Sequence, residues 1–75
     1  MKADQSLDCV GLYCPMPIVK TSEKIKELES GQVLEVVADD KGIKYDMPAW
    51  CKSTGNEYLG LEESGSEYKV YIKKK

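Results

Sequence analysis

The chain has 75 residues, of which 41% are hydrophobic and 32% are charged, and its formal net charge is -2. This composition is typical of a single small globular domain over residues 1–75 and is too apolar for a disordered segment. The near-neutral charge and the absence of arginine argue against direct binding to nucleic acid. With no apolar run of roughly 18 residues and no apolar signal core, we expect a cytoplasmic protein without a membrane span.

The first half of the chain predicts a strand, a helix and a second strand. Residues 5–9 form a short strand that Gly11 ends, and a helix follows from the Cys-Pro-Met-Pro segment to a C-cap at Ser30-Gly31. Its apolar positions recur at helical spacing and predict one buried stripe: Ile18, Thr21, Ile25 and Leu28. Residues 32–38 are rich in β-branched side chains, which favours a central strand parallel to the first.

The second half predicts a helix and two strands. Asp39-Asp40 offers N-cap chemistry for a helical stretch through about residue 54 that Gly55 closes. Because proline disturbs a helix interior, either the regular helix begins near Asp46, with Pro48 in its first turn, or residues 41–47 form an irregular lead-in. Residues 57–62 and 67–73 read as strands joined by a three-residue loop at 64–66. Alternation in the last strand predicts a dry face and a wetter face, the latter with Tyr71.

This order of elements, β-α-β-α-β-β, predicts an α+β fold. We expect a two-layer α/β sandwich in which two helices cover one face of a four-stranded mixed sheet.

The chain has no histidine and three cysteines, at positions 9, 14 and 51. Without histidine, the usual general base of a Ser/His or Cys/His hydrolase is missing. Three thiols alone make a poor structural zinc set, which needs four ligands, so we expect neither a metal nor a cofactor. An odd number of cysteines without an export signal indicates reduced thiols.

Cys14 is the candidate catalytic residue. Pro15 and Pro17 favour the first turn of a helix, and with Gly11 they are expected to hold Cys14 at the helix N-terminus. Unpaired N–H groups and the helix dipole would stabilise a thiolate there and lower the pKa of the thiol. Tyr13, Met16 and Lys20 flank this position; they are candidate partner contacts, although packing explains the first two equally well. Asp8 is expected to bond the backbone around the Gly11 turn.

The segment Asp8-x-x-Gly11-Leu12-x-Cys14-Pro15-x-Pro17 resembles the signature of the TusA/SirA-type sulfur-carrier family. The similarity continues through Val36-x-Ala38-Asp39-Asp40, Asp46-Met47-Pro48-Ala49-Trp50-Cys51 and Tyr71-Ile72-Lys73-Lys74, in the family's order.

The resemblance implies that Cys14 accepts sulfane sulfur as a persulfide and transfers it to a partner protein. The implied donor is a cysteine desulfurase or a rhodanese-like protein, and the implied acceptor is a DsrE-like protein or another sulfur-relay carrier. Such relays feed tRNA thiolation, cofactor synthesis or the oxidation of sulfur compounds, and carriage of thiosulfate is left open. Whether this sulfurtransferase-type carrier acts as an enzyme in the strict sense is also left open.

Two alternative hypotheses for the function remain. A thiol-disulfide redox protein would use Cys9 as the resolving partner of Cys14, although the spacing is not CxxC. In a non-catalytic regulatory interaction module, Cys14 would be incidental. Cys51 is expected to be a buried structural thiol, since free cysteines are commonly buried.

Overall fold

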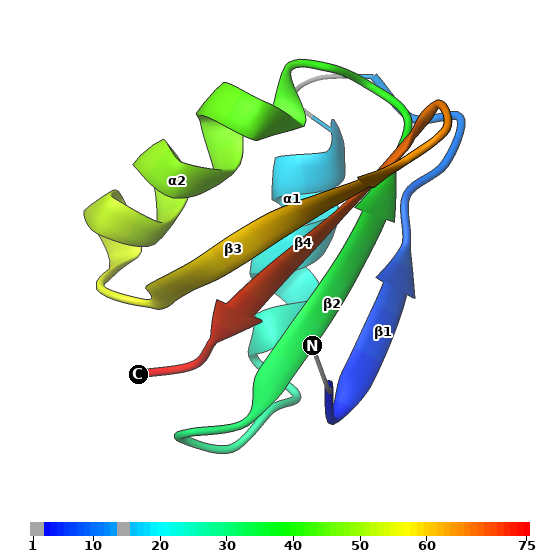
Figure 1. Ribbon diagram of the computed structural model, residues 1–75. Coiled ribbons are helices and arrows are strands. Elements are labelled where there is room, and N and C mark those ends of the chain that lie inside the picture. The colour runs from blue at the N-terminus through cyan, green and yellow to red at the C-terminus, as the bar shows by residue number, and fades with distance from the viewer. Residues whose placement is uncertain (1–2, 14–15) are drawn as a thin grey trace.

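The computed structural model describes residues 3–13 and 16–75 and confirms the predicted order of elements. The strands and helices are β1 (Gln5–Asp8), α1 (Met16–Ile25), β2 (Val33–Ala38), α2 (Ile43–Thr54), β3 (Glu57–Ser64) and β4 (Glu67–Lys73). The sheet has the order β1-β2-β4-β3, with β1 parallel to β2 and the other pairs antiparallel. Both helices lie on the same face of this mixed sheet, as predicted (Figure 1).

The core lies between the two central strands and the helices. Alternation along β2 directs Leu34, Val36 and Ala38 toward the helices, where all three are fully buried. The antiparallel partner β4 adds Val70 and Ile72 to the same layer. The helices complete the core with residues at helical spacing: Thr21 and Ile25 from α1, and Ile43, Met47 and Cys51 from α2.

The opposite face of the sheet is less exposed to solvent than the sequence predicts. Tyr71, expected on the wetter face, is only 3% exposed, and its hydroxyl donates a hydrogen bond of 2.9 Å to Glu35 Oε2. Ser6 donates to the other oxygen of the same carboxylate. A tyrosine ring can be buried on this face because its one polar group has a partner.

The prediction that α1 ends at Ser30-Gly31 is wrong. The helix ends at Ile25, and the N–H groups of Glu27 and Leu28 bond to carbonyls three residues earlier, which tightens the chain into turns. Leu28 still reaches the core from this turn and is 3% exposed. Gly31 has a φ of 87° and donates its N–H to the carbonyl of Lys74, so it shapes the approach to β2 and does not cap α1.

The second helix also begins elsewhere than predicted. It starts at Ile43, three residues before Asp46, and Pro48 lies inside it. The N–H groups of residues 43, 44 and 45 bond to carbonyls three residues earlier, and Asp40 Oδ1 accepts from the N–H of Gly42, which is the N-cap residue. This tight first turn carries the helix onward to Pro48, although proline supplies no N–H.

Further boundaries differ by one or two residues. β1 ends at Asp8, and β2 begins at Val33. The β3–β4 loop is shorter than predicted, because Ser64 pairs with Glu67 and leaves only Gly65 and Ser66 between the strands. Gly65 has a φ of 62°, which suits the glycine-first loop of a two-residue hairpin. The predicted closure of α2 at Gly55 is confirmed, with a φ of 84° and an N–H bonded to the carbonyl of Cys51.

Within residues 3–13 and 16–75, no helix is both long enough and apolar enough to cross a membrane.

Candidate functional site: the segment between β1 and α1

The predicted site occupies the connection between the end of β1 and the start of α1. Cys14 and Pro15, predicted as the reactive thiol and a helix-start proline, lie outside the described residues. Their described neighbours are joined by a hydrogen bond of 2.8 Å from the N–H of Met16 to the carbonyl of Tyr13. Since α1 begins at Met16, position 14 stands two residues before the helix in sequence.

Hydrogen bonds anchor the N-terminal arm of this segment. The N–H of Gly11 donates to Asp39 Oδ1 at 3.0 Å, and the N–H of Val10 donates to Asp8 Oδ1 at 3.0 Å, as expected for Asp8. The N–H of Leu12 bonds to the carbonyl of Cys9. Gly11 has a φ of 86°, a conformation that side chains rarely adopt, so the predicted support by this glycine is a matter of backbone shape.

Asp39 has a different role from the one predicted. The sequence suggests a helix N-cap, but Asp39 directly follows β2 and binds the Gly11 turn that follows β1. The two strands are parallel, so their C-terminal ends meet at one edge of the sheet. That parallel pairing, predicted from the sequence, is the signal that could have identified this contact.

The first turn of α1 favours negative charge nearby. It contains no acidic residue, so the partial positive charge of the helix N-terminus is not offset there. Pro17, the second residue of the helix, is buried, and its carbonyl accepts a hydrogen bond of 2.7 Å from Thr21 Oγ1. Lys20 is exposed on the same helix, and its charge partly offsets the rise that burial and Asp8 cause in the pKa of Cys9.

The other two thiols are shielded. Cys9 is 0% exposed, and burial, followed by the charge of Asp8, raises its pKa. Cys51 is 1% exposed, as expected of a structural thiol, and burial raises its pKa to about 11. Because the thiolate is the nucleophilic form, both side chains are poor nucleophiles at neutral pH.

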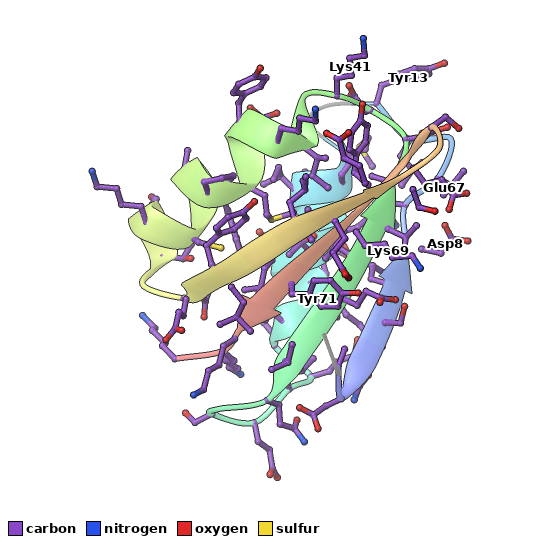
Figure 2. All side chains as sticks on the ribbon, in the orientation of Figure 1. Asp8, Tyr13, Lys41, Glu67, Lys69 and Tyr71 are labelled. Atoms are coloured by element: carbon purple, nitrogen blue, oxygen red, sulfur yellow. The ribbon has the colours of Figure 1, made fainter. Side chains whose placement is uncertain are left out.

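Exposed apolar side chains lie close to Cys14 in sequence. Of the five large hydrophobic residues that are exposed in the described ranges, four lie within five positions of Cys14: Val10, Tyr13, Met16 and Val19. Tyr13 is 78% exposed, and in Figure 2 it points outward at the same end of the molecule as Lys41. We call these four residues the apolar rim; Val10 and Val19 are members that the sequence reasoning missed. Exposed apolar side chains this close in sequence to a predicted reactive residue are candidate contacts for a partner protein.

Comparison with known proteins decides the family. The family model described as sulfurtransferase TusA matches residues 5–74. The chain belongs to this family. It is 44% identical over 71 residues to the sulfur carrier protein TusA of Allochromatium vinosum, covering 95% of this chain and 93% of the relative.

Two relatives from Bacillus subtilis differ in length. YrkI is 53% identical over 74 residues, which are 99% of each chain. YrkF is also 53% identical over 74 residues, but this chain spans only 40% of its length. Among solved structures, the SirA-like protein of Desulfitobacterium hafniense superposes with a TM-score of 0.80 and 24% identity, over 92% of this chain and 95% of that one. This last similarity supports the two-layer fold.

Proposed function

We propose that the chain is a single sulfur-carrier domain that holds sulfane sulfur as a persulfide on Cys14 and transfers it to a partner protein. The observation that carries the proposal is the burial of the two cysteines that the structure describes. Cys9 and Cys51 are buried with raised pKa values. The chain belongs to a sulfurtransferase family, and of its three thiols Cys14 is therefore the remaining candidate for carrying the sulfur.

Activation of Cys14 must come from its surroundings, because the chain has no histidine to take the proton. A position just before α1 would expose a thiolate to the unpaired N–H groups and the positive end of the helix dipole. The absence of acidic residues from the first turn supports this assignment. A persulfide anion would be held in the same way.

The transfer needs no outside oxidant or reductant. The Cys14 thiolate attacks the terminal sulfur of a donor persulfide, so that a new S–S bond forms while the donor's S–S bond breaks and its electron pair leaves on the donor thiolate. An acceptor thiolate then attacks the same terminal sulfur, and the Cys14 thiolate is the leaving group. Each step exchanges one S–S bond for another.

Membership of the family implies protein partners in a sulfur relay. The donor we propose is a cysteine desulfurase or a rhodanese-like protein, and the acceptor is a DsrE-like protein or another carrier. Tyr13, Met16 and Lys20 are the proposed contacts, with the rest of the apolar rim around them. The described cysteines are free thiols, which is consistent with the reducing cytoplasm as the place of action.

Intact-mass analysis tests the proposal. After incubation with a persulfide donor, a gain of about 32 Da is expected for the persulfide, or about 112 Da if thiosulfate is the cargo. Peptide mapping should place the adduct on Cys14. The adduct should be lost in Cys14→Ser and retained in Cys9→Ser and Cys51→Ser, which keep the proposed nucleophile.

The controls also separate the redox alternative. Labelling spread equally over the three cysteines would contradict the proposal. So would a reversible Cys9–Cys14 disulfide that supports reductase activity, an outcome that the burial of Cys9 disfavours.

A further inference from the structure

A cavity of about 370 Å³ lies at the other end of α1 from the predicted site. It is lined by Ser22, Ile25, Lys26, Trp50, Thr54, Asn56, Lys74 and Lys75. These residues come from the end of α1, the end of α2 and the segments beside the C-terminus, which Figure 1 shows on the same side of the molecule as the end of α2. The volume falls in the lower part of the range of about 300–1,000 Å³ for small-molecule sites.

The inner wall of the cavity is mainly carbon. Trp50 bridges the helices: its Nε1–H donates to Ser22 Oγ at 3.0 Å, beside the buried Ile25. Thr54 donates its hydroxyl to the carbonyl of Trp50, and the Asn56 amide donates to Thr54 Oγ1. Because these polar groups are already hydrogen-bonded to one another, the wall is suited to contact with the apolar part of a ligand.

The lining of the cavity carries positive charge. It carries three lysines and no carboxylate side chain among its lining residues. Lys74 Nζ is already used, because it donates to the carbonyl of Leu28. Lys26 and Lys75 take part in neither of the ion pairs found between described side chains.

The Lys75 side chain lies against the end of α2, where a Cβ on the C-cap residue Gly55 would stand 3.4 Å from Lys75 Nζ. The carbonyls of Lys24 and Ile25 accept from the turn that follows α1, and the carbonyl of Cys51 accepts from Gly55. The backbone oxygen of Lys75 accepts from Ser30 Oγ. Two cations beside an apolar wall are complementary to a ligand that is negative at one end and apolar along its body.

We propose that this cavity binds a small organic monocarboxylate, with its carboxylate between Lys26 and Lys75 and its hydrocarbon body against Trp50 and Ile25. The proposal does not depend on the sulfur chemistry.

Trp50 is the only tryptophan of the chain, so its fluorescence reports on the cavity directly. We expect a saturable change on titration with octanoate. Octylammonium and octanol, which have the same chain length without the negative charge, should bind more weakly. Added salt should weaken the binding of octanoate, because the charge contact is near the surface. A response that does not saturate, or equal affinity for octanoate and octylammonium, would overturn the proposal.

Matched variants locate the site. Lys26→Gln combined with Lys75→Gln should weaken octanoate binding at least about threefold, as expected when exposed charge contacts are lost. Lys41→Gln combined with Lys52→Gln removes the same charge away from the cavity lining and should leave the affinity unchanged. Equal weakening by both pairs would refute the assignment.

Amide chemical shifts provide the second measurement. Octanoate should move the resonances of the lining residues, and shifts centred elsewhere would contradict the site. Cys14→Ser should bind octanoate with the same affinity as the parent protein. The affinity of the parent protein should be the same with and without sulfur on Cys14.

Discussion

The two described cysteines show how burial suppresses the reactivity of a thiol. Cys9 directly follows β1 and is fully buried. Cys51 lies on the buried face of α2 with Met47. A buried thiol is reluctant to ionise, because the thiolate loses its hydration without gaining a partner. Burial therefore makes two cysteines structural residues and narrows the choice of a sulfur-carrying residue to Cys14.

The Cys51 thiol should make stability depend on alkaline pH. Its pKa is raised from the usual 9.0 to about 11 in the folded protein, so the unfolded chain loses this proton first as the pH rises. The contribution of the protonated Cys51 thiol to the free energy of unfolding is complete below pH 9 and is lost as the pH rises through 11. We expect a loss of up to about 2–3 kcal/mol in the free energy of unfolding, measured by urea denaturation between pH 7 and 11.

Cys51→Ala is the control, since tyrosines and lysines titrate in the same range. The difference in unfolding free energy between the parent chain and this variant should be constant below pH 8 and shrink between pH 9 and 11. A difference that stays constant up to pH 11 would mean that the thiol is not desolvated in the folded state.

At the level of elements, the parallel pair β1–β2 builds the proposed site. The strands end at one edge of the sheet, where Asp39 after β2 binds the Gly11 turn after β1. The turn then leads through Tyr13 toward the start of α1 at Met16. One side chain thus connects the end of the central strand to the segment that carries the proposed nucleophile.

Asp39→Ala should disturb this segment more than the fold. Loss of the acceptor for the Gly11 N–H should lower the free energy of unfolding by about 0.5–1.5 kcal/mol, the usual range for one hydrogen bond. The rate of sulfur transfer should fall several-fold, because the position of Cys14 becomes less restricted. Thermal denaturation and a timed persulfide transfer assay measure the two effects.

Asp39→Asn is the matched variant, since its side-chain oxygen can still accept the Gly11 N–H. It should retain most of the transfer rate. If Asp39→Asn and Asp39→Ala are equally impaired, the carboxylate charge matters and not the hydrogen bond. If neither is impaired, the anchor has no part in transfer.

At the level of the whole molecule, one core supports both regions. Its central layer is β2 and β4, and its other layer is the two helices (Figure 1). The predicted site precedes α1 at Met16, and the cavity reaches Lys26 just beyond its end, a rise of roughly 15 Å along the helix. Sulfur transfer and carboxylate binding can therefore be tested separately in one small protein.

Truncation in the central strand should destabilise the molecule as a unit. Leu34 is fully buried in the core, and Leu34→Ala should cost about 2–5 kcal/mol. That is a large part of the stability expected for a small domain, roughly 5–15 kcal/mol. Val33→Ala on the same strand is the control: Val33 is only half-buried, and the cost should be below about 1 kcal/mol.

Urea denaturation measures the stabilities, and alkylation of Cys9 and Cys51 reports on the core. In Leu34→Ala both thiols should become reactive over the same range of urea concentration, because one cooperative core shields them. Exposure of one thiol well before the other would show that the two ends of the core unfold separately.

The order of the elements, the two-layer fold and the choice of Cys14 as the candidate could all be predicted from the residues along the chain. Periodic apolar residues and the Cys-Pro-Met-Pro segment act locally, and local patterns can be read along a chain. Tertiary structure decided the rest, because these features depend on residues far apart in sequence. The role of Asp39 needed the parallel pairing across 28 positions, and the burial of Tyr71 needed Glu35 from the neighbouring strand. The start of α2 before Pro48 reflects the core that Ile43 and Met47 join, which outweighs the local cost of proline.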